Sequence, residues 1–376
     1  MPRRPLLRPK PGDADPSLYQ AADPGYPSNF SRDSLTYALL ADDFRALRSQ
    51  LEFSSSHQGQ RRDPETGEEP GKIHHELPGV RMRELLTTYN ACDTTALFLI
   101  GIHRLASLGD RDVGRRYRHN LDRALEYVHE HLYDDVFSED PAQCGAERFA
   151  LKVTYWKDSE LNVSGERREP TYPIAYALAH FQAKEALQAA ADITGSTELT
   201  ARAEAMTEKG FETFWRGDHF AVAVQRDGLV IDPPSSDSLH SLLFLRPNEI
   251  EASDAEAVVD YSDQLATAFG YLPGRAVAQS DDEYHTRWVW VHEQALLHAA
   301  ARRHGLERAE RIAERILPAF TQGFPELLDP ASGEPGGNPT QLWAVGAHVY
   351  FDHARVEKAL ARLQDVSNRR AQDRHS

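Results

Sequence analysis

The stretch from Ser31 to Phe53, SRDSLTYALLADDFRALRSQLEF, decides the fold class of this chain. Its apolar side chains recur at helical spacing, at Leu35, Leu39, Phe44, Leu47 and Leu51. This spacing places them on one face of an α-helix, and Ser31 and Asp33 are both suitable N-cap residues. The stretch therefore predicts a helix with one buried face.

The same periodicity continues along most of the chain. It predicts further helices at about 92–108, 112–133, 170–193, 197–215, 253–269, 287–304, 305–321, 340–351 and 353–368. Strand signals are few: Phe220 to Val230, with an Asp227-Gly228 turn, resembles a small hairpin or a loop that crosses the mouth of a helical barrel. The Ala-rich faces of the 170–193 and 287–304 segments permit close helix packing.

Helices of similar length, joined by short turns and separated by long polar loops, predict an all-α fold. We expect an (α/α)6 toroid with a small hairpin or loop insertion, and a superhelical solenoid is the structural alternative. Residues 1–25 are rich in Pro, Asp and Gly and predict an extended N-terminal arm. Residues 26–370 are expected to form one catalytic domain.

Composition limits the range of partners. The 376 residues include 42 Lys plus Arg against 58 Asp plus Glu, a formal charge of −16 that repels nucleic acids and anionic membranes and favours a neutral substrate. Two cysteines, Cys92 and Cys144, rule out a disulfide scaffold. We see neither the apolar core of a signal peptide nor a membrane-length apolar run, which predicts a cytoplasmic protein. The oligomeric state stays open.

The loops carry the candidate chemistry, because loops on a rigid scaffold hold most functional residues. In YPSNFSRDS, Arg32 can donate a planar fork of hydrogen bonds, Asp33 can accept from two hydroxyls, and Tyr26 or Phe30 can cover the ring of a sugar. A helix cap with a local ion pair explains the same residues equally well.

A second loop region, EPGKIHHEL at 69–77, followed by YNACDTT at 89–95, invites a metal hypothesis. His74, His75 and Glu76 are metal-ligating types, but no HExxH pattern occurs here, at 129–131 or at 292–293. We therefore expect no catalytic metal. Asp93 is interpreted as a helix cap or a substrate contact.

Two further loops each present one acid. Asp158 follows Trp156 and Lys157 in YWKDSE; burial against Trp would raise its pKa and Lys would lower it. Glu326 follows a proline in GFPELLD, which leads into a Gly- and Pro-rich segment. Either acid, taken in isolation, is also explained as a surface charge.

Taken together, these segments resemble a known family. FSRDSL, GKIHHEL, YNACDTTALFL, YWKDSE, YHTRWVWVHEQALL, GFPELLD and NPTQLWAVGA are similar, in this order, to blocks of the amylo-α-1,6-glucosidase domains of glycogen debranching enzymes. Related blocks occur in other α/α-barrel glycosidases. The resemblance covers most of residues 26–351. It implies an (α/α)6 barrel, no cofactor, a carbohydrate substrate and inverting hydrolysis by two carboxylic acids.

By position in these motifs, the resemblance implies that Asp158 is the general acid and Glu326 the general base. An inverting pair stands roughly 6.5–9.5 Å apart to leave room for water. Glu293, within an amphipathic helix, competes with Glu326, which we favour because of its rigid loop. The resemblance further implies sugar subsites lined by Arg32, Asp33, Lys72, His74, Glu76, Asp93, Trp156, Lys157, Trp288, Trp290, His292, Glu293, Gln341 and Trp343.

The chain lacks the large N-terminal domains of debranching enzymes, which favours an α-glucoside or a short α-gluco-oligosaccharide over a polymer. Two alternatives remain. One is an α/α-barrel sugar epimerase or a uronic acid lyase that uses histidines such as His240, His285 and His292. The other is a helical scaffold without catalysis.

Overall fold

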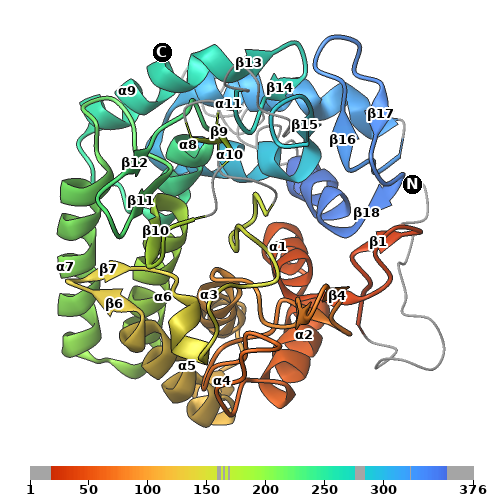
Figure 1. Ribbon diagram of the computed structural model, residues 1–376. Helices are drawn as coiled ribbons and strands as arrows, with labels where there is room; N and C mark the ends of the chain where they lie inside the picture. The colour runs from red at the N-terminus through yellow and green to blue at the C-terminus, as the bar shows by residue number, and fades with distance from the viewer. Residues whose placement is uncertain are drawn as a thin grey trace, which may run out of the picture.

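The computed structural model describes residues 18–158, 162–163, 166–167, 170–275, 284–321 and 323–353. Their helices form a ring of two concentric layers (Figure 1). The inner layer contains α1 (Ser31–Ala41), α3 (Thr94–Ser107), α6 (Ala177–Thr194), α8 (Asp237–Ser241), α10 (Val291–His304) and the helical residues 342–353. Going round the ring, α1 packs on α3, α3 on α6, α6 on α8 and α8 on α10.

Each inner helix from α1 to α10 is backed by an outer helix. The outer layer contains α2 (Phe44–Ser56), α4 (Val113–Arg116), α5 (Arg118–Glu130), α7 (Thr197–Phe214), α9 (Ala252–Ser262) and α11 (Glu307–Ala313), which continues as the 3-10 helix η4 (Glu314–Thr321). Inner helices such as α1 and α6 are buried over almost their whole surface, whereas α5 and α7 bury one stripe. A stripe-faced helix belongs at the surface and an all-buried one in the interior. The arrangement confirms the predicted helical toroid.

The first helical hairpin differs from the single helix that its periodicity predicts. Asp42 ends α1 in the left-handed conformation, with φ of 48°. Asp43 then caps α2, because its carboxylate accepts hydrogen bonds from the backbone of Arg45 and Ala46. The apolar spacing runs through both helices, so the pattern alone does not reveal the reversal between them.

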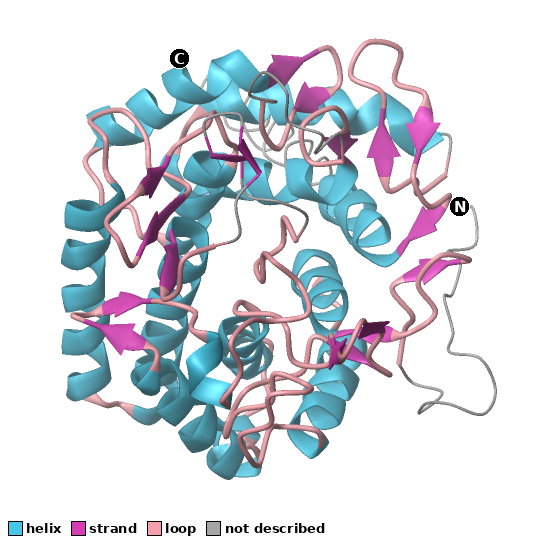
Figure 2. Ribbon diagram, in the orientation of Figure 1, coloured by secondary structure: helices cyan, strands magenta, loops and turns pink. Residues whose placement is uncertain are grey.

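The strands are short, and Figure 2 shows them among the loops that join the helices. They are β1 (Ala22–Asp23), β2 (Asn29–Phe30), β3 (Glu76–Leu77), β4 (Arg81–Met82), β5 (Leu85–Leu86), β6 (Leu132–Tyr133), β7 (Val136–Phe137), β8 (Asn162–Val163), β9 (Glu166–Arg167), β10 (Ile174–Tyr176), β11 (Ala223–Gln225), β12 (Val230–Ile231), β13 (Ala266–Thr267), β14 (Gly270–Tyr271), β15 (Val289–Trp290), β16 (Leu327–Leu328), β17 (Pro335–Gly336) and β18 (Thr340–Gln341). Short 3-10 turns are η1 (Pro141–Cys144), η2 (Leu242–Phe244) and η3 (Asp263–Leu265). The predicted hairpin is confirmed as β11 paired antiparallel with β12, with Gly228 in the turn at φ of 81°.

Several of these strands lead directly into inner helices. β2 precedes α1, β10 precedes α6 and β15 precedes α10, while β18 precedes residues 342–353. The pairing of β15 with β16 therefore delays the start of α10 to Val291, four residues after the start that periodicity predicts. This layout brings the N-terminal ends of the inner helices together with the loops before them.

The ring closes between its first and last inner helices. Gly346, in the helical segment 342–353, lies so close to α1 that an added Cβ would stand 3.0 Å from the Tyr37 Cα atom. At the same junction β1 pairs with β18, joining Ala22 to Gln341. Residues 18–25 of the predicted arm are thus partly packed on the domain; residues 1–17 and 354–370 lie outside the described residues.

The described interior is built mainly from two clusters of buried apolar side chains. The larger spans the layers from α1 to α11, and the smaller joins α10 and η4 to residues 342–353. Cys92 and Cys144 are buried and free. Among the described helices, none combines the length and the apolar character that crossing a bilayer requires.

Candidate active site

A small pocket opens where the inner helices begin, and we call it the inner pocket. Its volume is about 90 Å³. It is lined by Ala21, Tyr26, Phe30, Arg32, Asp33, His75, Trp156, Asp158, Tyr284, Trp290, Glu326, Gln341 and Trp343. Eight of these residues belong to the predicted catalytic and subsite residues, among them both proposed catalytic acids, and Tyr26, Phe30 and His75 were also considered from the sequence. Segments from residues 21 to 343 therefore converge on one site, as a closed ring allows.

Asp158 lines the inner pocket and precedes β8 in the chain. Its Oδ2 accepts a hydrogen bond of 3.3 Å from Nη1 of Arg32, and a third of its side chain remains exposed. Desolvation raises the pKa of the Asp158 carboxyl to about 6, although Arg32 acts in the opposite direction. An acid with this pKa is partly protonated near neutral pH and can donate a proton.

Glu326 is held on the same pocket by the sheet β15-β16-β17. It directly precedes β16, and its backbone N–H donates to Asn338 O at 2.9 Å. Its side chain accepts three hydrogen bonds: from the Tyr284 hydroxyl at 2.6 Å, and from the Asn338 backbone and side-chain nitrogens at 2.9 and 2.8 Å. Three donors suit the carboxylate form that a general base requires.

Arg32 contacts both Asp158 and Asp93. Its guanidinium makes a two-pronged contact with Asp93, at 2.8 and 3.0 Å, and also donates to the Thr154 carbonyl at 3.0 Å. Burial raises the pKa of Asp33 well above its ordinary value. The charge of Arg32 lowers this pKa, and the carboxyls of Asp158 and Glu326 raise it further. As a lining residue of the pocket, Asp33 is placed to form hydrogen bonds with sugar hydroxyls.

Aromatic side chains form much of the remaining wall. Trp156 and Trp290 meet edge to face at 5.8 Å, and Trp290 meets Trp343 in the same way at 5.6 Å. His292 stacks behind Trp343 at 3.8 Å. Aromatic faces of this kind pack against the C–H faces of sugar rings. The pocket thus combines stacking surfaces with hydrogen-bonding acids.

Eight nominated residues do not line the inner pocket. Lys72 is buried in an ion cluster with Glu69 and Glu139. The others contact pocket-lining or neighbouring residues: His74 contacts Ser31, Glu76 contacts Thr87, Asp93 binds Arg32, Lys157 binds Asp237, Trp288 packs at Gly336, His292 stacks on Trp343 and Glu293 contacts Ser236. Contact of these eight residues with a sugar stays a prediction.

Glu293 is the second candidate base that the sequence offered beside Glu326. The Glu293 side chain is fully buried in the first turn of α10. Burial raises the pKa of its carboxyl to about 7, although Lys157 and Ser236 act to lower it. It does not line the inner pocket, whereas Glu326 does.

A second, larger cavity adjoins the first at Asp158, and we call it the outer pocket. Its volume is about 620 Å³. It is lined by Arg81, Met82, Arg83, Leu85, Arg148, Phe149, Ala150, Leu151, Lys152 and Asp158. Four of its ten residues are basic, and Glu65 and Glu84 pair with Arg81 and Arg148 at its edge. Asp158 lines both pockets and so stands at the boundary between them.

Sequence reasoning missed the lining of the outer pocket other than Asp158, and near the two acids it missed Asp237, Tyr284 and Asn338. Asp237 begins the five-residue helix α8, which is too short to produce a periodic signal. Tyr284 and Asn338 are the first residues of two of the motifs quoted above, and both donate hydrogen bonds to Glu326. Their roles depend on contacts with Glu326 and with the loop before Asp158, which local patterns do not predict.

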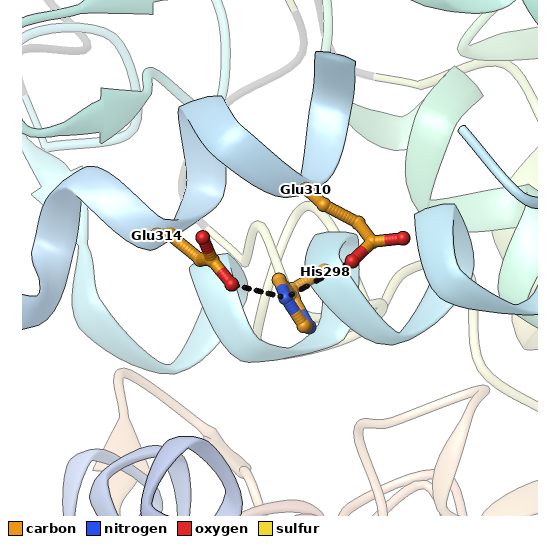
Figure 3. Close-up of side chains that lie close together, drawn as sticks. All are labelled: His298, Glu310 and Glu314. Carbon is orange, nitrogen blue, oxygen red and sulfur yellow. Dashed lines mark hydrogen bonds and ion pairs between the residues drawn. The ribbon is translucent and has the colours of Figure 1, made fainter. Parts of the chain in front are cut away.

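One group outside both pockets has the composition of a metal site. His298 of α10 faces Glu310 of α11 and Glu314 at the start of η4 (Figure 3), with Nε2 3.8 and 3.3 Å from their carboxylates. The other ring nitrogen lies 2.9 Å from the Tyr350 hydroxyl. These contacts tie α10 to α11, and they lie apart from the proposed chemistry.

Comparison with known proteins gives the site its context. The chain is similar in fold to a GH63 mannosylglycerate hydrolase from Thermus thermophilus in complex with Tris, with a TM-score of 0.65 and 14% identity over 90% of this chain and 97% of that one. The glucose complex of that hydrolase gives a TM-score of 0.65 and 13% identity over 89% of this chain and 96% of that one. A rhamnosidase from Klebsiella oxytoca with rhamnose bound gives a TM-score of 0.58 and 12% identity over 89% of this chain and 59% of that one. At these identities the likeness shows the fold.

No curated protein matches the chain. The sequence does match one family model, over residues 105–344, which is more than half of the chain. The match supports the predicted membership in the six-hairpin glycosidases in general. It does not support the more specific prediction of an amylo-α-1,6-glucosidase-like protein. The chain belongs to the family described as mannosylglycerate hydrolase MGH1-like glycoside hydrolase domains.

Proposed function

We propose that this glycoside hydrolase cleaves a small α-glycoside with inversion, with Asp158 as general acid and Glu326 as general base. One observation carries the proposal: Asp158 lines both the inner and the outer pocket. A general acid must reach the glycosidic oxygen, which lies between the sugar and its leaving group. The inner pocket then holds the sugar ring and the outer pocket holds the leaving group.

The reaction follows from these positions. A water molecule beside Glu326 gives a proton to its carboxylate while the water oxygen bonds to the anomeric carbon. The bond from this carbon to the glycosidic oxygen breaks, and that oxygen takes the proton of Asp158. The products are a sugar of inverted anomeric configuration and a free hydroxyl compound. Proton exchange with solvent restores the protonated Asp158 and the ionised Glu326.

The surroundings of the two carboxyls support this division of roles. Burial raises the pKa of Asp158, which keeps a proton available, while three donated hydrogen bonds suit an ionised Glu326. Glu293 is the weaker candidate for the base because it is absent from the pocket lining. The neutral histidine chemistry of an epimerase has less support: His240, His285 and His292 do not line the inner pocket of the described chain, and burial lowers the pKa of His285 to about 3.

We further propose that the leaving group is an anion. The formal charge of the whole chain favoured a neutral substrate, but the outer pocket beside Asp158 carries Arg81, Arg83, Arg148 and Lys152. Guanidinium groups bind carboxylates well. The family name refers to mannosylglycerate, and a Thermus thermophilus relative was solved with D-glycerate, which is a carboxylate.

The sugar is proposed to be a hexose in the α configuration. The resemblance to amylo-α-1,6-glucosidase motifs supports a glucosyl group, and the family description supports a mannosyl group. Glucosylglycerate and mannosylglycerate are therefore the first substrates to assay. Glucosylglycerol and mannosylglycerol are matched controls, because they replace the carboxylate of the leaving group by a hydroxymethyl group.

The variants Asp158→Asn and Glu326→Gln test the two roles on whichever substrate is hydrolysed. Each is expected to lower kcat by at least about 100-fold, because general acid or base catalysis contributes about 10²- to 10⁴-fold. Arg83→Ala is expected to raise the KM for the glycerate substrate and to leave the glycerol analogue unchanged. Full activity of Asp158→Asn or Glu326→Gln would remove that residue from the mechanism.

A further inference from the structure

Three consecutive side chains of the segment before Asp158 bind a single carboxylate, that of Asp237. The Tyr155 hydroxyl donates to its Oδ2 at 2.8 Å, and the Trp156 indole N–H donates to its Oδ1 at 3.3 Å. The Lys157 ammonium lies 2.8 Å from the same Oδ1. All four side chains are buried. Asp237 is therefore the common attachment point of the segment that carries the proposed acid.

The segment depends on such attachment because of its own conformation. Residues 155–157 are bent and belong to neither a helix nor a strand. The residue before them, Thr154, is held through its carbonyl by the Cys92 backbone N–H and by Arg32, each at 3.0 Å. Between Thr154 and Asp158, the contacts with Asp237 fix three successive side chains.

Lys157 adds further hydrogen bonds to this attachment. Its ammonium also donates to Ser235 Oγ at 2.7 Å and to the Pro273 carbonyl at 2.6 Å, which gives its three protons oxygen partners. A buried ion pair of this kind adds little net stability, because removing both charges from water costs about as much as their attraction returns. What the pair provides is a defined position for the residue that immediately precedes Asp158.

We infer that Asp237 is a positioning residue for the general acid, which it aims at the glycosidic oxygen through Tyr155, Trp156 and Lys157. The inference rests on the proposed function, because it assumes that Asp158 donates the proton. Asp237 itself does not line either pocket. Its effect on the reaction is therefore exerted through the segment 155–157.

The inference makes the effect of Asp237 depend on the leaving group. A glycerate leaving group needs a proton from a well-placed acid, and a misplacement of about 1 Å costs about 100-fold in rate. Fluoride leaves without protonation, so hydrolysis of a glycosyl fluoride needs the base and the sugar pocket but not the acid. A variant that misplaces only Asp158 must discriminate between these two substrates.

The test compares wild type and Asp237→Asn on an α-glycosyl glycerate and on the α-fluoride of the same sugar. The substitution keeps the shape of the side chain and removes the charge that pairs with Lys157. We expect kcat/KM on the glycerate substrate to fall about 100-fold and kcat/KM on the fluoride to change less than about threefold. An equal loss on both substrates would overturn the inference.

Two further variants make the result specific. Glu69→Gln removes a buried carboxylate that pairs with Lys72 and that lines neither pocket, and it should leave the ratio of the two substrates as in wild type. Tyr155→Phe deletes one hydrogen bond to Asp237 and should shift the ratio in the same direction by a smaller factor, so the test survives if Asp237→Asn does not fold. If wild type hydrolyses neither substrate, the proposed function fails, which is distinct from an unchanged ratio.

Discussion

Asp158 and Glu326 line one pocket in contrasting local environments. The carboxyl of Asp158 has lost most of its water and contacts one guanidinium nitrogen, that of Arg32. Glu326 instead accepts hydrogen bonds from Tyr284 and Asn338 on both of its oxygens. Pairs of carboxyls whose surroundings favour opposite protonation states are the usual arrangement in glycosidases.

The pKa of Asp158 leads to a prediction about pH. A general acid works only while protonated, and burial places the pKa of this carboxyl at about 6. Raising the pH through this value ionises Asp158, so kcat/KM should fall, by about tenfold for each pH unit above it. A pH profile of kcat/KM on the glycerate substrate measures this alkaline limb.

The fluoride substrate supplies the control for that profile. Its hydrolysis does not need the acid, so the limb near the pKa of Asp158 should be absent from its profile. A glycerate profile that stays flat well above that pKa would contradict the assignment of Asp158 as the acid.

At the residue scale the sequence nominated the two proposed acids, which line one pocket, but it did not predict what surrounds them. The motif order was sufficient to nominate Asp158 and Glu326. The neighbouring Lys157 was expected to lower the pKa of Asp158, yet its ammonium is bound to Asp237, and Arg32 of α1 is the cation that contacts Asp158. Adjacent residues in a bent segment can point in different directions, so the sequence order does not predict the charge environment.

At the scale of elements, the segment from β16 to β18 places the proposed base. Gly337 follows β17 with φ of 65°, and an added Cβ would stand 2.5 Å from Oε2 of Glu326. Gly337→Ala should therefore displace the Glu326 carboxylate. We expect kcat to fall about 100-fold, as for a displacement of about 1 Å, together with a loss of about 1 kcal/mol in the free energy of unfolding from the strained backbone.

Gly305→Ala is the matched control for the element-scale prediction. Gly305 has a similar φ of 72° at the end of α10, and an added Cβ would meet no atom within 4 Å. It should lose similar stability in urea unfolding and keep its kcat. Equal kcat values for the two variants would show that Glu326 does not depend on this close contact.

The elements themselves were predictable to the extent that they are long and periodic. The helices from α3 to α7 lie close to their expected ranges, apart from the delayed start of α6. The reversal at Asp42 was not predicted, because the apolar spacing continues through it. The helix α8 was not predicted, because its five residues are too few to show a helical period. Two-residue strands are set by tertiary pairing and leave no pattern of their own.

At the scale of the molecule, closure of the ring depends on a close approach of two inner helices. An added Cβ at Gly346 would stand only 3.0 Å from the Tyr37 Cα atom in α1, so a large side chain there has little room. Gly346→Leu should force α1 and residues 342–353 apart and lower the free energy of unfolding by about 3 kcal/mol, as overpacking of a dense interior does. Urea unfolding followed by circular dichroism measures this loss.

Ala201→Leu provides the comparison, because it adds the same side chain on the exposed surface of α7. It should change the free energy of unfolding by less than about 0.5 kcal/mol. Equal stabilities of the two variants would mean that the close approach at Gly346 does not limit the closure of the ring.

The charge of the whole molecule does not describe the charge of the outer pocket. The net charge of −16 describes an acidic surface, whereas four basic residues gather in the outer pocket. A local field depends on which side chains the fold brings together, and a composition does not contain this information. The anionic leaving group is accordingly proposed from the pocket and not from the sum of charges.

The central claim is that Asp158 and Glu326 act on opposite sides of the anomeric carbon, with a water molecule beside the base. Proton NMR during hydrolysis of an α-glycosyl substrate tests it most directly, because the anomeric signal of the first product appears before mutarotation. Direct attack by water on an α-glycoside should form the β-anomer first. Initial formation of the α-anomer would contradict the claim, since it would require a covalent intermediate in place of direct attack by water.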